Sequence, residues 1–191
     1  MYRAIQAAVA LAVVEEAARG IQQAMDAWDT VNDSFCDESG NVVDTDGWST
    51  RVVERDLAAW DHFTQILRYG AAFLFATRLP LNTDPQNTRL RHRRQELSRA
   101  YTSAHGTIRD ITNTSDPLHP RRREEMAVEV WHEMTVWAEH APAVIEAHRR
   151  ASAARAHAKD TVKARGTAPL PPAAAPQRPA LPPTRPSRRT P

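Results

Sequence analysis

The sequence predicts an all-α fold: an antiparallel up-and-down four-helix bundle with long helices and a disordered C-terminal tail. Glycine is scarce, with six in 191 residues, so turns are few and long helices are favoured. Apolar residues recur at alternating spacings of three and four in four long segments, which is typical of bundle packing. Nine of the fourteen prolines follow residue 166, in a stretch that has no acidic residue and no apolar periodicity.

These patterns divide the chain into residues 1–150 as the bundle, 151–165 as a helix extension, and 166–191 as a Pro/Arg-rich tail. The first helix is expected over about residues 3–32 and the second over about 50–79. Their predicted core stripes are Ala10, Val14, Ala17, Ile21, Ala24, Trp28 and Val31, and Val53, Leu57, Trp60, Thr64, Leu67, Ala71 and Leu74. Phe63, Ile66 and Phe73 widen the second stripe, and a small hairpin is expected around residues 39–41.

The third helix has a clear start, because Asp84 can cap it and Pro85 suits its first turn. The fourth is expected from about residue 120 as one continuous helix that Pro142 kinks rather than ends. Their stripes are Leu90, Arg94, Leu97, Tyr101, Ala104, Ile108 and Ile111, and Ala127, Val130, Met134, Trp137, Ala141, Val144 and His148.

Several classes of protein are disfavoured by composition. Cys36 is the single cysteine, so no internal disulfide can form, which fits a reducing cytoplasm. No stretch reaches the ~18 apolar residues of a membrane span, and the N-terminal segment matches a signal peptide poorly. Phosphate-binding glycine loops are absent. We therefore expect a cytoplasmic protein with no cofactor, no small-molecule substrate and no membrane contact.

Charge is distributed unevenly along the chain. Residues 1–148 carry 15 basic and 22 acidic residues, whereas residues 149–191 carry ten basic and one acidic. Up-and-down helices would gather a basic end from Arg3, Arg78, Arg89, Arg91, Arg93, Arg94, Arg149 and Arg150. The opposite end would hold the acidic residues Asp26, Asp29, Asp33, Asp37, Glu38, Asp44, Asp46, Glu54 and Asp56.

Such asymmetry favours a polyanion or a charged protein as partner. We predict a non-catalytic binding protein, an interaction or adaptor module that contacts nucleic acid through nonspecific electrostatics. The predicted nucleic-acid-binding residues are Arg89, Arg91, Arg93, Arg94, Arg149 and Arg150. A protein partner or a homodimer that uses the two charged ends is an open alternative, as is a purely solvated surface.

Metal and catalytic motifs are weak. Glu129 and His132 give one ExxH, but a di-iron bundle needs a second one together with carboxylates from the other helices. No metal site is therefore predicted. The segment from Arg55 to His62, "RDLAAWDH", resembles the Arg-x4-6-His motif of HEPN-type helical ribonucleases, and Arg99 to His105 and Arg150 to His157 also match. The resemblance implies an Arg/His pair that cleaves RNA at a dimer interface, for which both side chains should be exposed.

Overall fold

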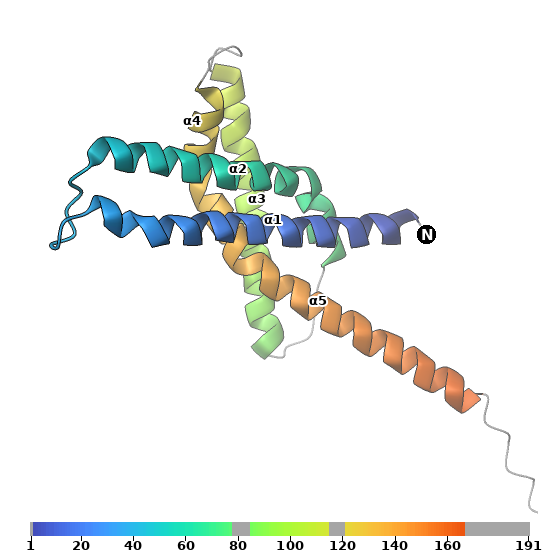
Figure 1. Cartoon of the computed structure of the whole chain (residues 1–191). Coiled ribbons are helices and arrows are strands. Elements are labelled where there is room, and N and C mark those ends of the chain that lie inside the picture. The colour runs from blue at the N-terminus through green and yellow to red at the C-terminus, as the bar shows by residue number, and fades with distance from the viewer. Residues whose placement is uncertain (1, 78–84, 115–120, 167–191) are drawn as a thin grey trace, which may run out of the picture. The chain divides into compact units, whose positions relative to one another are not determined.

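The computed structural model describes residues 2–77, 85–114 and 121–166, and there the fold is all-α, as predicted (Figure 1). The elements are α1 (Tyr2–Asn32), the 3-10 turn η1 (Asp33–Phe35), α2 (Thr45–Ala76), α3 (Pro85–Thr114), α4 (Arg122–Glu129) and α5 (Trp131–Gly166). The chain divides into two compact units, Met1–Ala153 and Ala154–Pro191. The predicted tail lies almost wholly outside the described residues, and the up-and-down arrangement of the bundle stays a prediction.

Helices α1 and α2 lie side by side (Figure 1). Their contacts run in opposite sequence order, since Gly20 lies against His62, Trp28 against Arg55, and Asn32 against Trp48. Helix α2 begins earlier than the apolar pattern predicts, because Asp44 caps it by accepting a hydrogen bond from the Gly47 backbone N–H at 2.9 Å.

The hairpin expected around residues 39–41 is present in the link between α1 and α2. Gly40 has a φ of 80°, a left-handed conformation that glycine adopts without strain. Its N–H donates to the Asp37 carbonyl, and Cys36 and Val42 face each other in a single antiparallel bridge. The Asp37 carboxylate accepts the backbone N–H groups of Ser39 and Asn41, and these hydrogen bonds, chiefly that from Asn41, lower its pKa.

The core draws on α1, α2, α3, α4 and α5. Phe63, Ile66 and Phe73 of α2 and Trp137 of α5 are completely buried, and each such side chain contributes roughly 1.5–3 kcal/mol of hydrophobic stabilisation. The predicted stripes hold for Ala10, Val14, Ala17 and Ile21 and for the set from Ala127 to Val144. Two predicted core positions are wrong: Val31 is 39% exposed and Ala71 is exposed. The buried face of α2 is centred on Phe63. Leu67 and Ala71 lie to one side of this face, so Leu67 is half-buried and Ala71 is exposed.

Helix α3 packs against the second half of α2. The Tyr101 hydroxyl donates to the Leu67 carbonyl at 3.0 Å, and the Arg94 guanidinium donates to the Leu74 carbonyl at 2.5 Å. Gly70 makes this approach possible, because a Cβ there would lie 2.7 Å from the Tyr101 ring. The Tyr101 ring in turn meets Trp137 at a centroid distance of 6.4 Å, which connects α3 to α5.

The single long fourth helix was predicted wrongly in one respect, because it is broken at Val130 into α4 and α5. Val130 has φ −103° and ψ 15°, yet hydrogen bonds from Val130 N–H to Met126 and from Met134 N–H to Val130 continue across it. The i to i−4 hydrogen bonds therefore continue across the break, and the backbone angles of Val130 depart from helical values. Pro142 lies inside α5 and does not end it, as predicted. Among the described helices, none is long and apolar enough to cross a membrane.

Candidate polyanion-binding surface

Four of the predicted nucleic-acid-binding residues lie together near the start of α3, and we call Arg89, Arg91, Arg93 and Arg94 the arginine collar. Arg89 and Arg93 are exposed and one helical turn apart, so they lie on the same side of α3. Arg91 and Arg94 are half-buried, and Arg94 is held by the Leu74 carbonyl. The collar thus has two arginines directed to solvent and two that also support packing.

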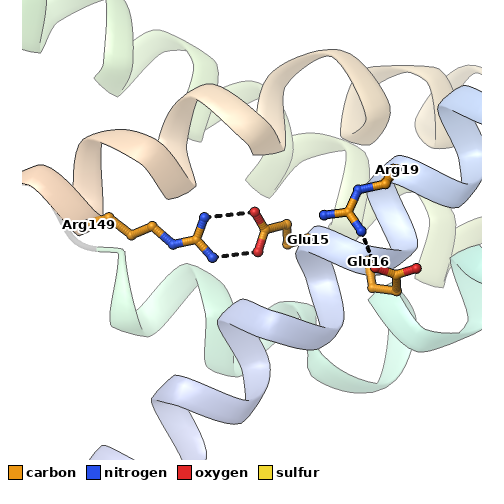
Figure 2. A network of polar contacts seen from close by, with 4 residues as sticks. All are labelled: Glu15, Glu16, Arg19 and Arg149. Atoms are coloured by element: carbon orange, nitrogen blue, oxygen red, sulfur yellow. Dashed lines mark hydrogen bonds and ion pairs between the residues drawn. The ribbon is translucent and has the colours of Figure 1, made fainter.

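The other two predicted binding residues, Arg149 and Arg150, are engaged in ion pairs. Figure 2 shows Arg149 reaching from α5 to Glu15 of α1, where the two terminal guanidinium nitrogens donate to the carboxylate at 2.8 and 2.5 Å. This two-bond contact lowers the pKa of Glu15 and raises that of Arg149. Arg150 donates to Glu146 one turn back at 2.9 Å. Arg149 is a weaker candidate for an anion surface than Arg89 and Arg93, because two bonds hold it to a carboxylate that is only 27% exposed, whereas the Arg150 pair is exposed on both sides.

The predicted basic end is only partly described. Arg78 lies outside the described residues, and the side chain of Arg3 does too. The structure brings the collar to α2, through Arg94 and Leu74, and brings Arg149 to α1, through Glu15. These are different anchoring points, so a single basic end formed by all eight arginines stays a prediction.

Arg55, the arginine of the segment that resembles the ribonuclease motif, is not exposed as that motif requires. Arg55 is only 17% exposed in its side chain, so the expectation that it is exposed is wrong, whereas His62 is exposed and lies over Gly20. The Arg55 guanidinium lies 3.9 Å from the ring centroid of Trp131 and 5.2 Å from that of Trp28. Arg55 Nε also donates to Asp56 at 2.8 Å. This arginine joins α1, α2 and α5, which argues against a role in RNA cleavage.

The sequence patterns did not predict that two acidic residues, Asp56 and Glu133, are buried. Asp56 was assigned to the acidic surface but is 3% exposed, and burial raises its pKa while Arg55 opposes that shift. The signal was present, because Asp56 precedes the buried Phe63 by one heptad on α2. Glu133 of α5 is 8% exposed and accepts a hydrogen bond from Ser103 of α3 at 2.6 Å. Both carboxylates are satisfied by a neighbour, as buried charges generally are.

Within the described ranges, no group of three or more His, Cys, Asp or Glu side chains could hold a metal ion. Glu129 and His132 are both exposed. No protein-family model, curated protein or solved structure is significantly similar to this chain.

Proposed function

We propose that this chain is a non-catalytic helical binding protein, an adaptor module whose arginine collar contacts polyanions such as nucleic acid. The observation that supports the proposal most is the state of Arg89 and Arg93. Both are exposed on one side of α3, and neither makes a hydrogen bond or ion pair with another residue in the described part of the chain. Their charge is therefore open to an external partner.

The neighbouring acid is already occupied. Glu96 is the only acidic residue within the first four turns of α3, and its carboxylate binds Arg99 at 2.7 Å and lies 3.3 Å from His92. The start of α3 thus combines four arginines with one carboxylate that other side chains share. A phosphate group that approaches Arg89 or Arg93 would meet little competition from the protein itself.

The test is retention of the purified full chain on immobilised nucleic acid, eluted with a salt gradient. We expect wild type to elute at higher salt than Arg89→Ala/Arg93→Ala, because each lost phosphate contact weakens the salt-dependent term. Deletion of residues 166–191, which carry four arginines and no acid, should lower the elution salt further. Arg51→Ala is the matched control, since Arg51 is an exposed arginine of α2 that pairs with Glu54.

Retention that does not change with salt, or that falls equally in Arg51→Ala, would overturn the proposal. Light scattering after size exclusion, with and without nuclease treatment, reports the oligomeric state and any co-purifying nucleic acid. A dimer that forms without nucleic acid, in a protein that is not retained, would favour the alternative of a protein-interaction module.

A further inference from the structure

Helix α3 remains cationic well beyond the collar. Over its full length it carries six arginines and two histidines against two acids, Glu96 and Asp110. In helical projection, the side opposite the buried Leu97, Ala104 and Ile111 holds Gln95, Arg99, Thr102, Gly106 and Arg109. Most of these side chains are exposed. The solvent face of α3 is thus polar and basic along its length.

Two adjoining shallow depressions, both wide open to solvent, lie on this face, and we call them hollows. The first, of about 350 Å³, is lined by Gln95, Ser98, Arg99, Thr102 and Ser103. The second, of about 460 Å³, is lined by Tyr101, Thr102, His105, Gly106 and Arg109. They share Thr102, so they follow one another along the helix. No carboxylate lines either hollow.

Not every hydroxyl in the hollows is free to donate. Thr102 donates to the Ser98 carbonyl at 3.0 Å and Ser103 donates to Glu133. The side chains with N–H donors in the lining are Gln95, Arg99, His105 and Arg109, and we call these four the α3 track. Tyr101 holds the His105 ring edge-on at a centroid distance of 4.5 Å.

We propose that the α3 track is a second contact surface for the phosphodiester backbone of nucleic acid, on a different side of α3 from Arg89 and Arg93. The inference rests on the proposed function and extends it from the start of α3 to Arg109. From Gln95 to Arg109 the helix rises about 21 Å at ~1.5 Å per residue, a length that covers several successive phosphates. Arg99 and Arg109 supply the charge, while the Gln95 amide and the His105 imidazole supply further N–H donors, a mixture typical of backbone contacts.

The ion pairs of the track do not prevent this use. Arg99 is 64% exposed and pairs with Glu96, and Arg109 is 73% exposed and lies 3.6 Å from Asp110. Exposed pairs of this kind contribute about 0–1 kcal/mol. A phosphate can therefore replace or share the carboxylate at little cost.

A lipid surface fits the α3 track less well than nucleic acid does. The exposed large apolar residues of the described chain are Ile5, Val9, Val31, Val42, Val43, Phe75 and Val128, and none of them belongs to α3. Binding to a membrane interface draws on buried apolar area as well as charge. The elongated row of donors and the absence of an apolar edge favour a linear polyanion.

The experiment is fluorescence anisotropy with the full chain and a labelled oligothymidylate of about twenty nucleotides, repeated over a range of salt concentrations. We expect Arg99→Gln/Arg109→Gln to weaken binding and to reduce the slope of log K against log[salt] by about 1.4, because each phosphate contact on a single strand contributes about 0.7. Arg51→Gln should leave the slope unchanged. Glutamine removes the charge and keeps a comparable helix preference, and circular dichroism verifies the fold.

Three results would overturn the inference. If Arg89→Gln/Arg93→Gln reduces the slope but Arg99→Gln/Arg109→Gln does not, the proposed function stands and the α3 track fails. If wild type shows no salt-sensitive binding, both fail. If polyglutamate displaces the oligonucleotide as well as unlabelled oligothymidylate does, the surface fits an acidic protein and the assignment to nucleic acid is wrong.

Discussion

Replacing Arg55 with alanine is expected to destabilise the fold by about 3–4 kcal/mol, because it leaves the Asp56 carboxylate buried without a partner. The wild-type pair is well protected from solvent, with side-chain exposures of 17% for Arg55 and 4% for Asp56 and a closest contact of 2.7 Å. The substitution also removes the stacking on Trp131 and Trp28, worth about 0.5–2 kcal/mol and overlapping with the first loss.

Urea unfolding followed by far-UV circular dichroism measures this loss as a change in the free energy of unfolding. Burial already raises the pKa of Asp56, and without Arg55 it should rise further. Protonation then removes the buried charge, so the destabilisation should be smaller at about pH 5 than at about pH 8. The double variant Arg55→Met/Asp56→Leu should be more stable than Arg55→Ala, since it removes both charges and keeps apolar volume.

The control is Arg51→Ala on the same helix, whose exposed pair with Glu54 should contribute less than about 1 kcal/mol. A loss in Arg55→Ala as small as in this control, with no dependence on pH, would refute the view that Arg55 holds α1, α2 and α5 together.

Further stability predictions follow from two glycines and one ion pair. Gly70→Ala should destabilise by about 1–2 kcal/mol in urea unfolding, because the new Cβ would lie 2.7 Å from a Tyr101 ring that Leu67 and Trp137 hold in place. Gly106→Ala, with nothing within 4 Å of the new Cβ, should instead stabilise α3 by up to about 1 kcal/mol; equal effects of the two would contradict the close approach at Gly70. Glu15→Gln should cost less than about 1 kcal/mol at neutral pH. Because the pKa of Glu15 is lowered in the folded state, its contribution is present above the ordinary carboxylate value of 4.5 and is lost as pH falls through the folded pKa, so wild type and Glu15→Gln should converge in acid.

Local sequence signals predicted most of the helices. The alanine-rich stripe of α1 and the glycine in the connecting turn place α1 and the turn to within a few residues, whereas the apolar pattern places the start of α2 about five residues too late, because the Asp44 cap was not recognised. The break at Val130 was not predictable, because apolar residues keep their helical spacing on both sides of it. The break coincides with tertiary contacts, since Val130 is fully buried and Arg55 lies over the ring of the next residue, Trp131.

The candidate site was harder to predict than the helices. Charge and helical periodicity found the collar, and the exposed state of Arg89 and Arg93 agrees with it. They could not show that Arg149 is paired, because its partner Glu15 lies 134 residues away in the sequence. The basic face of the α3 track was missed, although the predicted stripe of Leu97, Ala104 and Ile111 already places Arg99 and Arg109 on the opposite side of the helix.

The central claim is that α3 carries the polyanion surface, and amide chemical-shift mapping by NMR tests it directly. A titration of the isotope-labelled chain with oligothymidylate should perturb amides from Arg89 to Arg109, with the largest shifts at the exposed arginines. The hairpin around Gly40 should remain unperturbed. Shifts concentrated on that acidic hairpin, or none on α3 at saturating oligonucleotide, would contradict the account.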